Sequence, residues 1–244
     1  DKPSGAVVPG VGTQMLRAQG FELHQGHFTA PSATFFVGGS LPAGPELFKH
    51  AGGTYVANSG RVVFDPQGTN CTTPTYIIDV LPSTLFHDLE FIGSHGCAIS
   101  AVFSTGTDTL RMANALHHTD GLLHGTLALQ GDIHVGANAD GGTARILVNG
   151  AAQQHYHMAA GAGRTAMVVV DKPGASFLPA PGTTTLAIQN LEVRNGTFRT
   201  PADTLRIGGK HTPDISALLL QTGGTIDAVN GVVLFDPDQV KPST

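Results

Sequence analysis

The chain of 244 residues carries 13 lysines and arginines against 18 aspartates and glutamates, together with 12 histidines and no tryptophan. The net charge of −5 excludes a typical nucleic-acid-binding protein, because phosphate binding needs an excess of lysine and arginine. No window reaches the roughly 18 consecutive apolar residues that a membrane-spanning helix requires.

Short runs of strand-forming residues recur along the whole chain, separated by turn residues. The 32 glycines and 15 prolines favour many short strands joined by turns. Two segments, 45–53 and 108–118, have the apolar spacing of short helices. The predicted strands cover 33–37, 61–65, 75–80, 88–92, 126–131, 144–148, 166–170, 185–189, 204–207, 217–221 and 231–235.

The sequence contains an internal duplication. Residues 1–39 and 171–209, aligned with an offset of 170, are identical at 15 of 39 positions. "GGTYVANSGRVVFDP" (52–66) and "GGTIDAVNGVVLFDP" (223–237), offset by 171, share nine of 15. We therefore predict a first complete unit at 1–170 and the start of a second unit at 171–244, continuous with the first. Because the chain opens on Asp1 rather than methionine, we expect a processed product or a window from a longer array.

Two all-β architectures fit this pattern. Tandem antiparallel β-sandwich repeats would give units of about 100 residues joined by hairpins. A right-handed parallel β-solenoid would stack coils of roughly 20 to 25 residues, and we favour it because the strand–turn spacing is short. The predicted core consists of Phe28, Val62, Phe64, Ile77, Phe91, Leu127, Leu129, Ile146, Val168, Phe198, Ile207 and Phe235.

Five segments carry a resemblance to a known class: "GHFTAPSATFFVGG", "GGTYVANSGRVVFDP", "LFHDLEFIGS", "GRTAMVVVDKPG" and "NGTFRTPADTLRIGG". Their turn-and-strand pattern resembles the glycine- and threonine-rich β-solenoid repeats of bacterial secreted and cell-surface proteins. The resemblance implies a secreted or surface-attached structural repeat, for which adhesive or matrix roles are common. The many histidines and the helix-like stretch from Pro45 to His50 depart from that pattern.

Histidine is the main candidate for chemistry. His155 and His157 are two positions apart and would share one face of a strand, where they could bind one metal ion. His117, His118 and His124 form a second set that could bind zinc or copper. In the second copy, however, His24, His27 and His50 are replaced by Arg194, Thr197 and Gln221. We favour histidines scattered on a polar face and assign no metal, cofactor or catalytic residues.

Several residues repeat at equivalent positions in both copies, which favours a role in folding. Asp65 and Asp236, each in "FDP", are predicted to turn the chain, with a calcium ligand as the alternative. Asp1 and Asp171, followed by Lys2 and Lys172, are predicted to form contacts at a solvated corner.

The cysteines and carboxylates leave further alternatives open. Cys71 and Cys97 would pair if the protein is secreted, or would otherwise be small buried residues. Asp88 and Glu90, two positions apart, would share one strand face, which suits solvent as well as catalysis.

These observations predict a non-enzymatic structural segment of an extracellular or cell-surface protein, acting as a stalk, a fibre or an adhesive module. Its expected partners are further repeat units, by end-to-end association, and a surface polysaccharide or matrix. We expect no nucleic acid and no membrane insertion. The alternative is a carbohydrate-binding or polysaccharide-cleaving parallel β-helix, although three tyrosines and no tryptophan offer few rings for stacking on sugars.

Overall fold

The computed structural model describes residues 5–41, 46–67, 73–93, 101–159, 161, 163–209 and 217–236. All the regular structure in these ranges is β-strand, and no helix among them could span a membrane. The strands are β1 (Ala6–Val7), β2 (Met15–Ala18), β3 (Phe21–Leu23), β4 (His27–Thr29), β5 (Thr34–Ser40), β6 (Glu46–His50), β7 (Thr54–Val56), β8 (Arg61–Gln67), β9 (Thr75–Val80), β10 (Leu85–Phe91), β11 (Val102–Leu129), β12 (Asp132–Ala139), β13 (Arg145–Val148), β14 (Gln154–Met158), β15 (Met167–Pro179), β16 (Thr185–Ile188), β17 (Leu191–Arg199), β18 (Thr204–Ile207), β19 (Leu219–Gln221), β20 (Thr225–Asp227) and β21 (Val232–Phe235).

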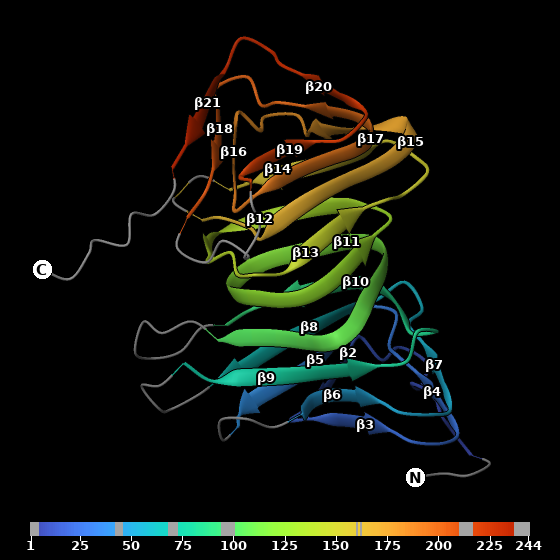
Figure 1. Cartoon of the computed structure of the whole chain (residues 1–244). Coiled ribbons are helices and arrows are strands. Elements are labelled where there is room, and N and C mark those ends of the chain that lie inside the picture. Colours follow the sequence, from blue (N-terminus) through green and yellow to red (C-terminus); the bar gives the residue numbers. More distant parts are fainter. Residues whose placement is uncertain are drawn as a thin grey trace, which may run out of the picture.

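Every ladder between named strands in the described part of the chain is parallel. The sequence separation of paired positions varies: His117 pairs with His134, whereas Glu46 pairs with Ile77, nearly twice as far along the chain. Figure 1 shows the chain rising overall from its N-terminal strands, blue at the base, to its C-terminal strands, orange and red at the top. For these residues the antiparallel sandwich alternative is wrong, because hairpin-connected strands would pair in opposite directions.

Two long strands turn corners and pair with different neighbours along their length. β11 has 28 residues and pairs with β10 and β12 through one part and with β13 through another. Gly121 and Gly125 lie within it at φ of 85° and 96°, a backbone conformation that glycine adopts without strain. Because β15 similarly pairs with both β13 and β14, the strands β11, β12, β14, β15 and β13 form a closed five-strand parallel barrel.

The core runs through the middle of these layers and is rich in aromatic rings near the base. Phe21 packs on Phe28 and Phe48 with ring centroids 4.6 and 4.8 Å apart, and Phe48 packs in turn on Phe86 at 5.4 Å. Such aromatic pairs contribute roughly 0.5–1.5 kcal/mol beyond the area they bury. The predicted core positions Phe28, Val62, Phe64, Phe91, Leu127, Leu129, Ile146, Val168, Phe198 and Ile207 are all buried.

Two predicted core positions are wrong. Ile77 is 39% exposed, because β9 points Tyr76 and Ile78 inward and Ile77 therefore outward. Phe235 is 50% exposed although it pairs in register with the buried Ile207. Among the described residues no further strand pairs with the outer side of β21, so its apolar side chains are left uncovered.

The two predicted helices are also wrong. Residues 46–50 of the first segment form β6, and the second segment, 108–118, lies within β11. β6 pairs with β3 on one side and β9 on the other, so its backbone groups bond to neighbouring layers instead of within a helical turn. Helical spacing over so short a run is a weak preference that these two ladders override.

The strand pairings recur with the offsets of the sequence duplication. Met15 pairs with Thr34, and 170 positions later Thr185 pairs with Thr204. The same holds, with offsets of 170 or 171, for β3–β6 and β17–β19, for β4–β7 and β17–β20, and for β5–β8 and β18–β21. The division into units at 1–170 and 171–244 stays a prediction, but it agrees with these registers.

The register of β9 gives a test with a matched control in the adjacent residue. Ile78→Ala removes a fully buried side chain and should lower the free energy of unfolding by about 2–5 kcal/mol. Ile77→Ala, at the exposed neighbour, should cost less than about 1 kcal/mol. Urea denaturation of both variants measures the difference, and equal losses would show that the assigned inward phase of β9 is incorrect.

Candidate functional site

Three histidines form a stack on the outer face of the layers. His117 of β11 pairs in register with His134 of β12, which pairs with His157 of β14. The ring centroids are 4.4 and 4.1 Å apart and the ring planes lie within 12° of parallel. Parallel strands in register place equivalent side chains about 4.8 Å apart, which is close to the separation of stacked rings. We refer to His117, His134 and His157 as the imidazole stack.

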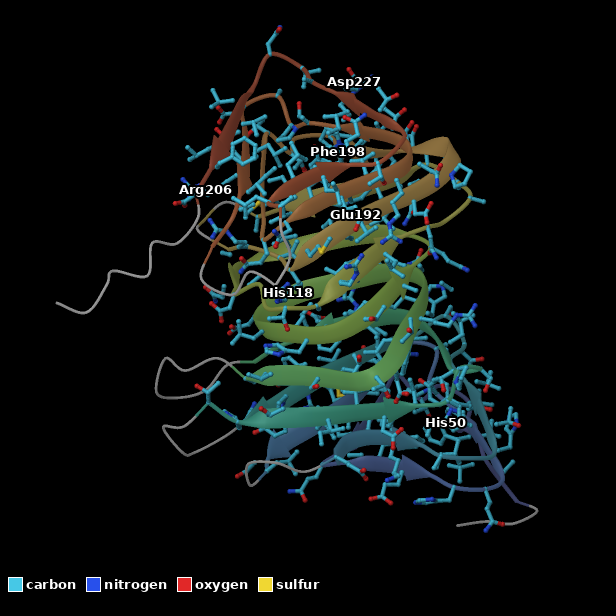
Figure 2. The ribbon with its side chains drawn as sticks, in the orientation of Figure 1. His50, His118, Glu192, Phe198, Arg206 and Asp227 are labelled. Carbon is cyan, nitrogen blue, oxygen red and sulfur yellow. The ribbon has the colours of Figure 1, made fainter. Side chains whose placement is uncertain are left out.

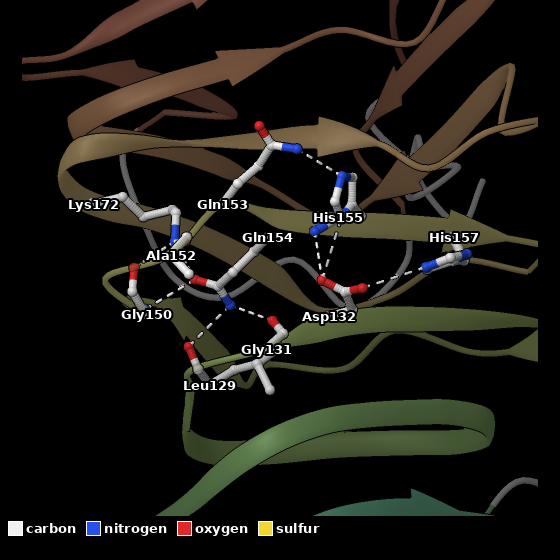
Figure 3. A network of polar contacts seen from close by, with 10 residues as sticks. All are labelled: Leu129, Gly131, Asp132, Gly150, Ala152, Gln153, Gln154, His155, His157 and Lys172. Carbon is white, nitrogen blue, oxygen red and sulfur yellow. Dashed lines mark hydrogen bonds and ion pairs between the residues drawn. The ribbon is translucent and has the colours of Figure 1, made fainter.

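The Asp132 carboxylate lies between the two outward histidines of β14 (Figure 3). Its oxygens are 3.6 Å from His155 Nδ1 and 3.6 Å from His157 Nε2. The same carboxylate accepts the backbone N–H of His155 at 2.6 Å. The Gln153 amide donates to His155 Nε2 at 2.9 Å, so in neutral His155 the proton sits on Nδ1, facing Asp132.

Burial keeps part of the stack uncharged at neutral pH. Burial lowers the pKa of His134, as do the neighbouring His117 and His157, because a second positive charge in the stack would be repelled; together they bring it to about 4. The pKa of His117 is also lowered, mainly by burial and then by the nearby Arg61. His134 and His117 are therefore neutral rings at pH 7.

Both members of the predicted carboxylate pair bond to other layers, and Glu90 lies directly below the stack. Glu90, whose position is in register with His117, is 2.9 Å from Arg61 Nη1 and accepts a hydrogen bond from Thr119 Oγ1 at 2.9 Å. Asp88 accepts bonds from Asn114 Nδ2 at 2.6 Å and from the backbone N–H of Ala115 at 3.0 Å. Both carboxylates connect neighbouring strands, which is a structural use of the polar face.

The structure does not bring the predicted histidine sets together as metal ligands. No group of three or more histidine, cysteine, aspartate or glutamate side chains in the described ranges is arranged to hold an ion. The parallel rings of the stack do not direct their in-plane lone pairs toward a common point. His155 and His157 share a face as predicted, but each approaches a different oxygen of Asp132.

His118 has a structural role in the interior. It is fully buried, lies on the opposite face of β11 from His117, and is near mid-height in Figure 2. Its Nε2 donates to the Gly121 carbonyl at 2.8 Å, and its Nδ1 accepts from the Thr165 hydroxyl at 3.0 Å. These two bonds satisfy the neutral imidazole, and burial lowers the pKa of His118 to about 4.

Histidines of the first copy bond to nearby side chains. His24 bonds to Glu22 at 2.9 Å and His27 to the Thr29 hydroxyl at 3.0 Å. His50, near the base in Figure 2, bonds to the Thr84 hydroxyl at 2.7 Å.

Lys172 overturns the prediction of a solvated corner. Its side chain is completely buried, and its ammonium donates to the carbonyl of Gly150 at 2.5 Å, to that of Ala152 at 2.7 Å and to Gln154 Oε1 (Figure 3). Gln154, also buried, donates to the carbonyls of Leu129 and Gly131. Three acceptors match the three ammonium protons, and burial lowers the pKa of Lys172 to about 8.

Other predicted positions have simpler outcomes. Asp171 accepts a hydrogen bond from Asn195 at 2.7 Å. Asp236 lies 3.5 Å from Arg164, and the Gln67 amide donates to Asp65 at 3.4 Å. Cys71, Cys97, Asp1 and Lys2 lie outside the described residues.

Comparison of the chain with protein-family models, with curated proteins and with solved structures finds no match in any of the three. Sequence reasoning missed His134, because the spacing from His117 to His134 differs from that between His134 and His157, and no motif has such an irregular spacing.

The lowered pKa values predict a pH dependence of stability. In the unfolded chain a histidine has a pKa near 6.5, so between about pH 4 and 6.5 the folded chain binds fewer protons than the unfolded chain. The contribution of these two histidines to stability should therefore be fully present above pH 6.5 and decrease toward pH 4, by about 3 kcal/mol for His118 and by less for His134, whose ring is partly exposed to solvent. Urea denaturation across this pH range measures the slope of the unfolding free energy against pH. His134→Gln should reduce it, whereas Ile77→Ala, at an exposed position without a titratable group, should not. An unchanged slope in His134→Gln would contradict the assignment.

The buried ammonium gives another test. Lys172→Met leaves two carbonyls and the Gln154 oxygen without their shared donor, and should cost about 2–4 kcal/mol of unfolding free energy. Lys49→Met, which breaks the partly exposed pair of Lys49 with Glu46, should cost less than about 1 kcal/mol. If thermal or urea denaturation gives equal losses for the two variants, the ammonium does not organise the Gly150–Gln154 turn.

Proposed function

We propose that the chain is a right-handed parallel β-solenoid segment with a structural, non-enzymatic role in an extracellular or cell-surface protein. The recurrence of the parallel strand pairings at the offset of the sequence duplication carries this proposal. In such an assembly each layer contacts mainly its neighbours, so length grows by adding units without changing the layers already formed. A stalk, a fibre or an adhesive module uses this property.

The polar outer face supports a mechanical role. Arg61 and Glu90 connect β8 with β10, and Arg199 and Asp227 connect β17 with β20. Individually such exposed pairs contribute little, about 0–1 kcal/mol. Together with the backbone ladder they link each layer to the next, so a load is carried through many bonds.

The carbohydrate alternative has less support. A hollow of about 300 Å³ next to Phe36 and Gln67 would be the natural place for a sugar. However, the Arg17 guanidinium lies 4.2 Å from the centroid of the Phe36 ring and occupies the face on which a sugar would stack. Asp88 and Glu90, the candidate catalytic pair, both bond to neighbouring strands. A surface polysaccharide or matrix remains a proposed contact of the outer face.

Single-molecule stretching between the two termini tests the structural role. Layers that contact mainly their neighbours should unfold one at a time. Because a layer holds roughly 17 to 31 residues, each event should release about 60–110 Å of chain. A saw-tooth trace with such increments is expected. A single rupture that releases the whole folded chain would contradict a segment that yields layer by layer.

A further inference from the structure

The base of the molecule has an uncovered apolar surface next to a hollow of about 250 Å³. Val7, Phe21, Glu22, Leu23 and Phe28 line this hollow, which we call the basal hollow. Val7 is 49% exposed and the Glu22 side chain 58%. No strand of the described residues covers the lower side of β3.

The internal duplication provides a covered version of the same surface. The positions equivalent to Val7, Leu23 and Phe28 are Phe177, Val193 and Phe198. All three are at most 1% exposed. Gln154 of β14 pairs with Phe177, Val170 of β15 pairs with Val193, and the Tyr156 ring packs against Phe198. Figure 2 places Phe198 and Glu192 high in the stack, far above the base. The chain thus shows one surface covered and its duplicate open.

Three kinds of contact cover the upper copy. Val168–Val170 of β15 pairs in register with Leu191–Val193 of β17. Tyr156 lies under the phenyl rings, with centroids 5.2 Å from Phe177 and 5.9 Å from Phe198, and its hydroxyl donates to the Arg199 carbonyl at 2.8 Å. Backbone pairing, ring packing and this hydrogen bond together specify the shape of the covering segment.

The charges of the two surfaces also correspond. In the upper copy Glu192 binds Arg194 at 2.7 Å from its own strand and Arg145 at 2.9 Å from the segment below. At the base, Glu22 has the counterpart of the first contact, to His24 at 2.9 Å, which occupies the position of Arg194. Among the described residues nothing takes the place of Arg145 below it; the nearby charge of Lys49 lies above, in β6. The Glu22 side chain is mostly exposed, and an arginine placed like Arg145 would give it the second contact.

We propose that the basal hollow is the docking surface for a preceding repeat unit, and that its occupant is a segment with the chemistry of residues 145–170. Three elements define this segment: an arginine for Glu22, a tyrosine for the Val7–Phe28 hollow and a valine strand for the edge of β3. The proposal rests on the proposed function, since it requires that units add in series. A second copy of this chain does not fit, because its own residues 171–209 already cover that segment.

A fused chain tests the proposal, with residues 1–170 placed directly in front of the whole chain. Because the chain lacks tryptophan, Val7→Trp in the downstream copy supplies a single fluorescent reporter. In the unfused chain its emission should be that of an exposed indole. In the fused chain we expect a blue shift and a severalfold decrease in acrylamide quenching. Val11→Trp is the control, since Val11 and its equivalent Pro181 are both exposed and the emission should be the same in both chains.

Charge reversal provides a second measurement that does not use the reporter. Arg145→Glu in the upstream unit places two carboxylates together, so urea denaturation should show a loosened junction, and adding Glu22→Arg downstream should restore it. If the Val7→Trp reporter is equally exposed in both chains, or the reversal is not rescued, the proposal fails. If the unfused chain buries the reporter as its concentration rises, the occupant is a second copy instead.

The two proposals fail separately. If the reporter is buried in the fused chain but stretching gives a single rupture, the docking proposal stands and the mechanical role is rejected. If stretching gives stepwise release but the reporter stays exposed in the fused chain, the mechanical role stands and the docking proposal is rejected.

Discussion

The parallel backbone ladder, kept in register from layer to layer, is the interaction on which the rest of the structure depends. Parallel strands place like positions directly above one another at about 4.8 Å, so each side chain has its nearest neighbours in the strands above and below. The layers differ in length, since the one from His117 to His134 is much shorter than the one from Glu46 to Ile77. Turns and long connections absorb this difference, and the parallel pairing does not change. Glycines at positive φ, such as Gly121 within β11, allow the corners that this requires.

The ladder also determines where chemically similar groups meet. Inside, Phe21, Phe28 and Phe48 pack on one another near the base, and Tyr156, Phe177 and Phe198 pack near the top. Outside, the same geometry produces the imidazole stack. Stacked histidines are tolerated only while at least some of them are uncharged, and burial lowers the pKa of His134 to about 4. The stack is therefore a consequence of register that costs little at neutral pH and becomes unfavourable in acid.

How much could be predicted from the sequence depends on whether the signal was local. Runs such as 61–65 and 166–170 predicted strands because β-branched and aromatic residues and flanking glycines act within a few positions, and the duplication predicted the recurring layers. The inward phase of β9 was not predictable, since Ile77 and Ile78 are identical residues and pairing with β6 and β11 selects between them. The prediction of two helical segments was wrong because ladder bonds on both sides outweigh a weak local preference.

The contacts of Lys172 and His134 were missed because their partners lie in other layers. Lysine beside aspartate in "DKP" suggested a solvated contact, whereas the ammonium binds the turn at Gly150 and Ala152. Distance along the chain does not indicate such contacts when the number of residues in each layer varies.

Duplication gives the ends of such a structure a defined chemistry. Because registers recur with the repeat, any surface that is open at the base of the first unit has a counterpart that is covered within the chain. Equivalent positions of the repeat differ in exposure: Val7 is exposed where Phe177 is buried, and Glu22 is exposed where Glu192 is buried. An uncovered parallel edge flanked by apolar side chains is a site for pairing with another strand. The repeat restricts which strand fits, through the arginine, tyrosine and valines of residues 145–170, so the same register that builds the interior also selects the strand that can add at the end.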